Sequence, residues 1–343
     1  MTATVRVMSA EEIAAQAGGS TPFLLWPDRA TMFAERAMRL RQLAGGHAMG
    51  DYLRFMAALA MAQQRALAAI GDAVPLPSAA DLDAAARAGR PPLPAVDWPR
   101  DAAWRQAARQ MAAALAADAS GDVPAALRQR LGELPATDDD WFERQADALL
   151  TGVMQGLELA TSALVAGALQ AWWTHLVGAV HAGHQGGGQA FGLTDDRSVC
   201  PCCGSRPTVS ITRHGGQATG QRYLHCSLCA TQWHVPRGQC SHCGSKKSVA
   251  YQSLALPELD DGDEEARSRA AQAAVQAETC DDCNHYLKIL HTDRDAQAEP
   301  VADDLASITL DLLVADGPHQ RHGVNLMLLF GAPDGSATDD PPP

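Results

Sequence analysis

The first half of the chain has the hydrophobic spacing of helices. Between residues 29 and 44, apolar side chains recur every three or four positions, at Phe33, Ala37 and Leu40, and this is the period of an amphipathic helix. Proline or aspartate before such stretches and glycine after them are typical start and stop signals. The pattern predicts helices over residues 29–44, 52–70, 79–88, 101–117, 124–131, 138–152 and 154–181. We therefore expect an all-helical domain over residues 1–190.

The last of these helices contains a long, nearly apolar segment. Residues 157–180 approach the roughly 20 residues that span a bilayer. However, Glu158, Gln170 and His175 interrupt the run, and no basic cluster flanks it. Such a segment is typical of a helix buried in a protein core. We expect no membrane insertion.

After Gly192 the pattern changes to short runs of β-branched and aromatic residues, which indicate strands. The expected strands cover residues 208–212, 222–225, 232–235, 249–254 and 286–290. One helix is expected over residues 302–314, with Leu305, Ile308, Leu312 and Leu313 on one side. The last residues, 331–343, are expected to form a disordered tail.

Eight cysteines interrupt the strand-like segments as four C-x-x-C pairs. They are Cys200 and Cys203, Cys226 and Cys229, Cys240 and Cys243, and Cys280 and Cys283. One tight turn presents both thiolates of such a pair to one ion, so four pairs supply two tetrahedral metal sites. The expected fold is therefore an all-α domain followed by two tandem four-cysteine modules of the rubredoxin or zinc-ribbon type and a C-terminal helix.

Spacing favours pairing between neighbours in the sequence. The 22 residues between Cys203 and Cys226 have the pattern of strand, Gly-Gly turn and strand. The 36 residues between Cys243 and Cys280 likewise begin with a strand-like segment and return to the second cysteine pair after an acidic insertion. The first module then spans residues 191–238, and the second, with the C-terminal helix, spans residues 239–330. An interleaved cross-brace, joining the first pair to the third and the second to the fourth, is the alternative.

Each metal-binding turn needs a residue that tolerates a positive φ after its second cysteine. Gly204 and Gly244 suit this position, and Asn284 is the next-best choice. Ala230 departs from the pattern, so we expect the turn of Cys226 to be less regular. The ninth cysteine, Cys202, lies inside the first turn, where we expect its side chain to point away from the ion as a free thiol.

Metal explains the eight paired cysteines better than disulfides or dithiol exchange. The first 20 residues lack the features of a secretory signal, so we expect a cytoplasmic protein, in which disulfides are rare. Four pairs without a thioredoxin-like context argue against redox catalysis. Iron and zinc both accept four thiolates. The expected cofactors are therefore two ions, each held by four cysteines, with iron or zinc as the metal.

Other side chains near the cysteines are given structural roles. His225, His234, His242 and His285 crowd the region, but eight thiolates already fill two sites, so we expect the histidines around the sites or at the surface. Asp303 and Asp304 are expected to be first-turn acids of the C-terminal helix rather than a general acid and base. The sequence has no phosphate-binding glycine loop, no G-x-S-x-G and no H-E-x-x-H. We expect no enzymatic activity.

Charge is distributed unevenly along the 343 residues, whose net charge is -13. Residues 197–251 contain seven basic and no acidic side chains, whereas residues 252–343 contain five basic and 19 acidic ones. A basic segment on an acidic chain is weak evidence for nucleic-acid binding, because the summed field repels phosphate. An ion held by four thiolates also attracts nearby cations. We therefore expect no nucleic-acid partner.

Several segments resemble one family. RYLHCSLCATQWHVPRGQCSHCG and AETCDDCNHYLKIL, followed by EPVADDLASITLDLLV and RHGVN, are similar to FdhE, the formate dehydrogenase accessory protein family. The N-terminal WPDRATMFAERAMRLRQLAGGHAMGDYLRFMAALAMAQ resembles the opening helices of the same family. RYLHCSLC and ETCDDCNHYLK are specific, whereas bare C-x-x-C pairs are not.

The resemblance implies a cytoplasmic assembly factor for respiratory formate dehydrogenase, a molybdenum or tungsten enzyme exported by the twin-arginine pathway. Such a factor binds the immature catalytic subunit before export. The resemblance also implies that the eight paired cysteines hold rubredoxin-like iron, or zinc in its place, with Cys202 outside the pattern. The residues alone indicate a metal-stabilised interaction protein. The alternatives are a rubredoxin-like electron carrier and a nucleic-acid-binding zinc-ribbon protein.

Overall fold

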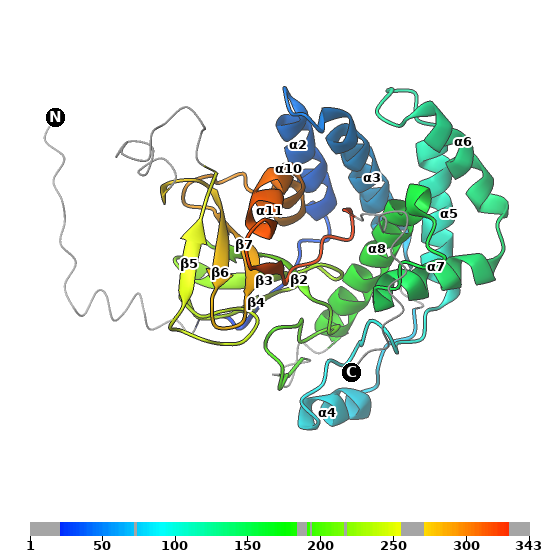
Figure 1. The fold of residues 1–343 in the computed structure, drawn as a ribbon. Coiled ribbons are helices and arrows are strands. Elements are labelled where there is room, and N and C mark those ends of the chain that lie inside the picture. The colour runs from blue at the N-terminus through cyan, green and yellow to red at the C-terminus, as the bar shows by residue number, and fades with distance from the viewer. Residues whose placement is uncertain are drawn as a thin grey trace, which may run out of the picture.

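The fold is described from a computed structural model that covers residues 21–71, 74–183, 191–192, 194–215, 218–254 and 271–328. Helices occupy the N-terminal half, and a sheet with two C-terminal helices occupies the rest (Figure 1). The expected tail at residues 331–343 lies outside the described residues.

The predicted helices of the first half are all present. They are α2 (Met32–Ala44), α3 (Gly50–Ala69), α4 (Ala79–Arg87), α5 (Ala102–Ala116), α6 (Ala125–Glu133), α7 (Asp139–Thr151) and α8 (Leu159–Gly183), with a short 3-10 turn, η1 (Leu134–Ala136), after α6. Asp101 and Asp138 cap α5 and α7 by accepting hydrogen bonds from backbone N–H groups of their first turns. Gly152, with φ at 75°, ends α7 in the left-handed conformation.

Helix α8 lies near the centre of the molecule, where it packs against α3, α5, α6 and α7 (Figure 1). It is the one helix among the described residues that is long and apolar enough to cross a membrane, but 83% of its most apolar window is buried. Trp172 and Trp173 are fully buried and contact each other edge to face. The prediction of a core helix is therefore confirmed.

All strands in the described part of the chain belong to one sheet with the order β1-β4-β3-β2-β7-β6-β5, and β8 pairs with β7. The strands are β1 (Leu24–Leu25), β2 (Pro207–Thr212), β3 (Arg222–Cys226), β4 (Gln232–His234), β5 (Val249–Gln252), β6 (Val275–Cys280), β7 (His285–His291) and β8 (Gln320–Arg321). The two predicted ribbons are β2–β3–β4 and β5–β6–β7. They join through a parallel pairing of β2 with β7, in which Ser210 lies opposite Ile289. The tandem modules thus share one continuous sheet.

The prediction of a single C-terminal helix over residues 302–314 is wrong in one respect. The chain forms two helices, α10 (Pro300–Ala306) and α11 (Ile308–Ala315), with a break at Ser307. Lys288 of β7 stabilises this break, because its Nζ donates hydrogen bonds to the Asp304 carbonyl at 2.7 Å and to Ser307 Oγ at 3.0 Å. Backbone carbonyls at the end of a helix lack partners within the helix and attract a cation. Leu312 and Leu313 are exposed instead of packing beside Leu305.

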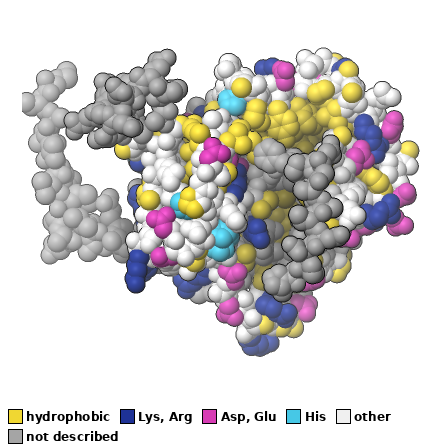
Figure 2. Space-filling view, viewed as in Figure 1, with side chains coloured by type: hydrophobic (Ala, Val, Ile, Leu, Met, Phe, Trp, Pro, Cys, Tyr) yellow, Lys and Arg dark blue, Asp and Glu magenta, His cyan; other side chains and the backbone are white. Residues whose placement is uncertain are grey.

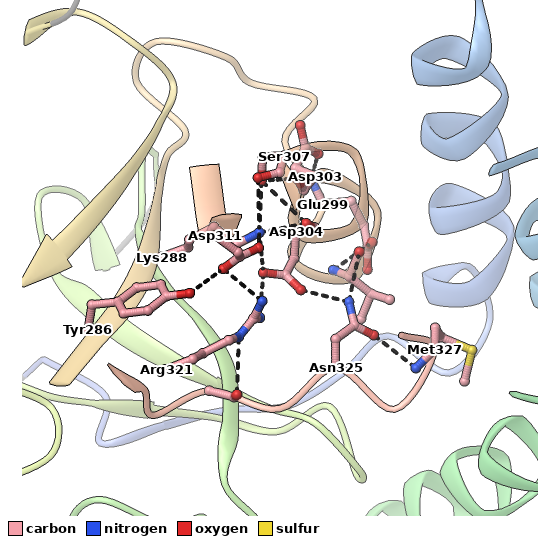
Figure 3. A network of polar contacts seen from close by, with 12 residues as sticks. Tyr286, Lys288, Glu299, Asp303, Asp304, Ser307, Asp311, Arg321, Asn325 and Met327 are labelled. Carbon is pink, nitrogen blue, oxygen red and sulfur yellow. Dashed lines mark hydrogen bonds and ion pairs between the residues drawn. The ribbon is translucent and has the colours of Figure 1, made fainter. Parts of the chain in front are cut away.

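A buried network of charges holds this region together (Figure 3). Lys288 and Asp304 are fully buried and form an ion pair at 2.9 Å. Arg321 binds Asp304 at 2.7 Å, and Asn325 donates to the same carboxylate at 2.8 Å. Asp311 accepts from Lys288 at 2.6 Å. The network joins β7, both C-terminal helices and the segment that follows them.

Candidate metal centres

The sulfur atoms of the first two cysteine pairs converge on one point. Cys200 Sγ lies 3.6 Å from Cys229 Sγ, and Cys203 Sγ lies 3.4 Å from Cys226 Sγ and 3.7 Å from Cys229 Sγ. All four side chains are buried. We call this group the first centre. Cys202 is also buried, but it is not one of the four converging residues.

The other two pairs form a second centre of the same kind. Cys240 Sγ lies 3.7 Å from Cys283 Sγ, and Cys243 Sγ lies 3.8 Å from Cys280 Sγ. Cys240 and Cys280 are buried, Cys283 is half-buried and Cys243 is exposed. Each centre therefore combines cysteine pairs that are neighbours in the sequence, and the cross-brace alternative is excluded.

The sulfur spacing of both centres is compatible with a metal site. A metal–sulfur distance of about 2.3 Å in a tetrahedron separates the sulfurs by roughly 3.8 Å, whereas a disulfide bond measures about 2.05 Å. Burial raises the pKa of the Cys200 and Cys226 thiols. A bound cation opposes this effect because it stabilises the thiolates directly. The donor set of each centre therefore fits iron or zinc and leaves no open ligand position.

The four turns have the same backbone conformation after the second cysteine. Gly204 and Gly244 have φ at 75° and 76°, and Asn284 has φ at 55°, as predicted. Ala230 has φ at 60°, so the expectation of a less regular turn is wrong in this respect. The hydrogen bonds from the Leu228 and Cys229 N–H groups to Cys226 Sγ, both 3.4 Å, show that the turn also directs backbone donors at the sulfur.

The helical half supports the first centre from two directions. Leu93 and Ala95, in the loop before α5, donate backbone hydrogen bonds to the carbonyls of Cys202 and Cys203 at 3.1 and 2.8 Å. Gln170 of α8 donates to the Ser227 carbonyl at 2.7 Å. The loop and the core helix therefore hold both turns of this centre, which explains its complete burial.

A buried arginine supports the second centre. Arg222 of β3 is fully buried, and its guanidinium donates to the carbonyl of Gln239 at 2.8 Å, just before Cys240. It also binds Glu278 at 2.6 Å, just before Cys280 in β6. Burial raises the pKa of Glu278, although Arg222 opposes the shift. One side chain thus fixes the chain before both halves of the second centre.

Comparison with known proteins identifies the family. Three family models match in succession: FdhE N-terminal at residues 21–186, the FdhE central domain at 199–237 and the FdhE C-terminal domain at 239–328. An FdhE homologue of Pseudomonas aeruginosa is 38% identical over 310 residues, which are 90% of this chain and 94% of that protein. The chain belongs to the FdhE family. This confirms the family indicated by the motifs, that of the formate dehydrogenase accessory proteins.

Two further relatives extend the match. The FdhE protein of Escherichia coli is 33% identical over 331 residues, covering 96% of this chain and 99% of its own length. The crystal structure of the FdhE protein from Pseudomonas aeruginosa matches with a TM-score of 0.75 and 37% identity, over 91% of this chain and 100% of that one. The overall arrangement described here is thus also that of a solved FdhE structure.

The histidines of this FdhE-family chain have different surroundings. His225 is buried beside the first centre. Its burial, and to a smaller extent the positive charges of Arg36 and Arg213, lower its pKa to about 3. His234 contacts Gln221 at 3.1 Å. His242 and His285 lie against the second centre. His322 was not predicted to join this group. Its ring centroid lies 4.9 Å from that of His242, and no pattern in the 79 residues between them indicates the contact.

Asp303 and Asp304 have more specific roles than ordinary first-turn acids. Asp303 lies in the first turn of α10, where its carboxylate accepts from Arg39 of α2 at 2.9 Å. Asp304 is fully buried in the network with Lys288 and Arg321. These acids therefore join the C-terminal helices to the rest of the fold.

A cleft of about 570 Å³ lies beside the first centre, between α2, the segment before α10 and the first ribbon. His225 and Ala230 line it, and each is adjacent in sequence to a cysteine of that centre. Met38, on α2, contributes an apolar side chain that is 54% exposed. The Nδ1 atom of His225 is buried without a hydrogen-bond partner among the described residues. The cleft is thus a concave surface of mixed polarity, positioned by the first centre.

Proposed function

We propose that this protein is a maturation factor for respiratory formate dehydrogenase. It binds the immature catalytic subunit in the cytoplasm, before twin-arginine export, and turns over no substrate. The observation that carries this proposal is family membership along nearly the whole chain, through all three FdhE family models. The alternative of a nucleic-acid partner has less support, because basic and acidic side chains are interspersed on the face shown in Figure 2.

The eight paired cysteines are proposed to hold two ions of iron or zinc. The sulfur spacing of both centres supports this role. Four protein ligands per ion leave no position for a substrate, as in structural zinc sites. The ions act mainly by holding the turns and the sheet in the shape that meets the partner, because the binding of a metal by four ligands contributes directly to folding.

The cleft beside the first centre is the proposed contact with the catalytic subunit. Arg36 pairs with Glu299 and Arg39 pairs with Asp303, so the walls of the cleft are already fixed by ion pairs between α2 and α10. An apolar anchor inside a polar rim is the usual anatomy of a protein interface. Met38 is the exposed apolar side chain in this position.

Capture of the catalytic subunit by the full-length protein tests the proposal. Met38→Glu is expected to weaken capture on the order of tenfold or more, as for a central interface residue. Val153→Glu is the matched control, because Val153 is similarly exposed, at 51%, and does not line the cleft. Equal capture by both variants would exclude the cleft as the contact. Failure of the unmodified protein to capture the subunit would contradict the proposed function itself.

A further inference from the structure

Three imidazoles gather beside the second centre. The rings of His242 and His285 stack with centroids 3.9 Å apart, and His322 contacts His242 at 4.9 Å. Ligand atoms of His242, His285 and Cys283 all lie within 4.8 Å of one another. Cys283 therefore belongs to two groups of possible metal ligands, the four-cysteine centre and this outer group.

The hydrogen bonding of His285 leaves one ring nitrogen available. Its Nδ1 lies 2.7 Å from the Cys283 carbonyl, and since a carbonyl only accepts, Nδ1 carries the proton. In the neutral ring, Nε2 then presents a lone pair, which is the form that binds metals. The hydrogen bond to the carbonyl also fixes the ring, as partners of metal-bound histidines commonly do.

Exposure places this outer group on the solvent side of the second centre. His242 and Cys243 are exposed and Cys283 and His285 are half-buried, whereas Cys240 and Cys280 are buried. All four sulfurs of the first centre are buried, and among the described residues no histidine joins them in a ligand group. The solvent-facing side of the second centre thus carries Cys243 and the outer group.

We propose that His242, His285 and Cys283 form a capture position through which divalent iron or zinc enters and leaves the second centre. The inference rests on the proposed function in that the centre holds an ion. Imidazole and thiolate are both good ligands for these metals. The exchange involves no redox step: the ion keeps Cys283 as a ligand and trades the two imidazoles for the other three thiolates, and each bound thiol releases its proton to solvent.

One movement is required. The two rings are stacked and inclined by only 18°, so their lone pairs lie in nearly parallel planes and converge on one ion only when a ring turns. His242 is the less restrained ring: it contacts the rings of His285 and His322, but its side chain is exposed and no hydrogen bond among the described residues holds its imidazole. His285 stays fixed by the Cys283 carbonyl.

Release of zinc from the zinc-loaded full-length chain to a chelator that changes colour on binding tests the inference. Two phases are expected, the faster from the second centre, identified by alkylation of Cys240, Cys243, Cys280 and Cys283. In the double variant His242→Ala/His285→Ala, this phase should slow severalfold, because no imidazole ligand receives the outgoing ion; a faster phase would show that the imidazoles only support the centre and would contradict the inference. The slow phase and the total zinc released should not change.

Two further variants make the result specific. His242→Ala alone changes an exposed side chain and should slow the fast phase to a smaller extent, so the test does not depend on the double variant. His214→Ala, an exposed histidine outside the cluster, should leave both phases unchanged. Three other results would overturn the inference. They are an unaltered fast phase in the double variant, equal slowing of that phase by His214→Ala, and a double variant that already contains one zinc ion fewer per chain before the chelator is added. Absence of bound metal from the unmodified protein would instead contradict the proposed metal centres.

Discussion

At the residue scale, the position after each second cysteine sets the shape of the metal-binding turns. These four residues all have φ between 55° and 76°. A side chain with a Cβ pays roughly 1–2 kcal/mol for this conformation, and glycine avoids the cost. The chain thus accepts strain at Ala230 and reduces it at Gly204 and Gly244.

Replacing Gly244 by alanine is expected to lower the free energy of unfolding by about 1 kcal/mol. The added Cβ meets only the flexible end of the Gln239 side chain, at 3.3 Å, so the backbone conformation accounts for the loss. Gly132→Ala is the control, because Gly132 lies within α6 without a positive φ. That change should raise stability by up to about 1 kcal/mol. Urea unfolding of the metal-loaded variants measures both, and effects of the same sign would contradict this explanation.

The sequence was sufficient to predict which eight cysteines converge and how their pairs combine. A C-x-x-C turn is a local structure, and each of the two intervening segments begins and ends with strands that bring its flanking cysteine pairs together. It was also sufficient for Gly204, Gly244 and Asn284. The expectation for Ala230 failed because intrinsic preference is weaker than the geometry that the whole turn imposes. The ligand role of the cysteines, and iron or zinc as the metal, stay predictions.

At the element scale, the helix break at Ser307 depends on charges contributed by distant parts of the chain. Hydrophobic periodicity predicted one helix, since Leu305, Ile308 and Leu312 recur at helical intervals. It contained no information about Lys288, whose ammonium binds the carbonyl of Asp304. The two-residue strands β1 and β8 were missed for a similar reason, because they form only by pairing with β4 and β7.

The buried network predicts how stability responds to acid. Burial acts to raise the pKa of Asp304, but Lys288 and Arg321 hold it below its usual value. The unfolded chain therefore binds this proton more readily than the folded one. The ionised Asp304 carboxylate therefore stabilises the fold at pH values above about 3.9, the pKa of an aspartate in the unfolded chain. This stabilisation is lost as the pH falls through the lower pKa that Asp304 has in the folded protein.

Asp304→Asn removes this contribution. The variant should be less stable by about 3 kcal/mol near neutral pH, because buried cations lose their partner, and the difference from the unmodified protein should shrink below about pH 4. Unfolding measured across this range checks the trend, with the exposed Asp83→Asn as control. A difference that stays constant with pH would show that the ionised carboxylate is not the source.

At the scale of the whole molecule, segments far apart in the sequence form one sheet and share a large hydrophobic cluster. Strands β2 and β7 pair in parallel although about 80 residues separate them, and no local pattern marks that pairing. A single hydrophobic cluster contains residues of α8, the first centre and α10, among them Trp173, Cys226 and Leu305. The predicted boundaries at residues 190, 238 and 330 stay predictions.

The metal content of the full-length protein, purified without oxygen and without added metal, tests the central claim most directly. Two ions of iron or zinc per chain are expected, with the eight paired cysteines protected from alkylation until a denaturant and a chelator are added together. A folded, native chain with no bound metal and eight freely reactive or disulfide-linked cysteines would contradict the account.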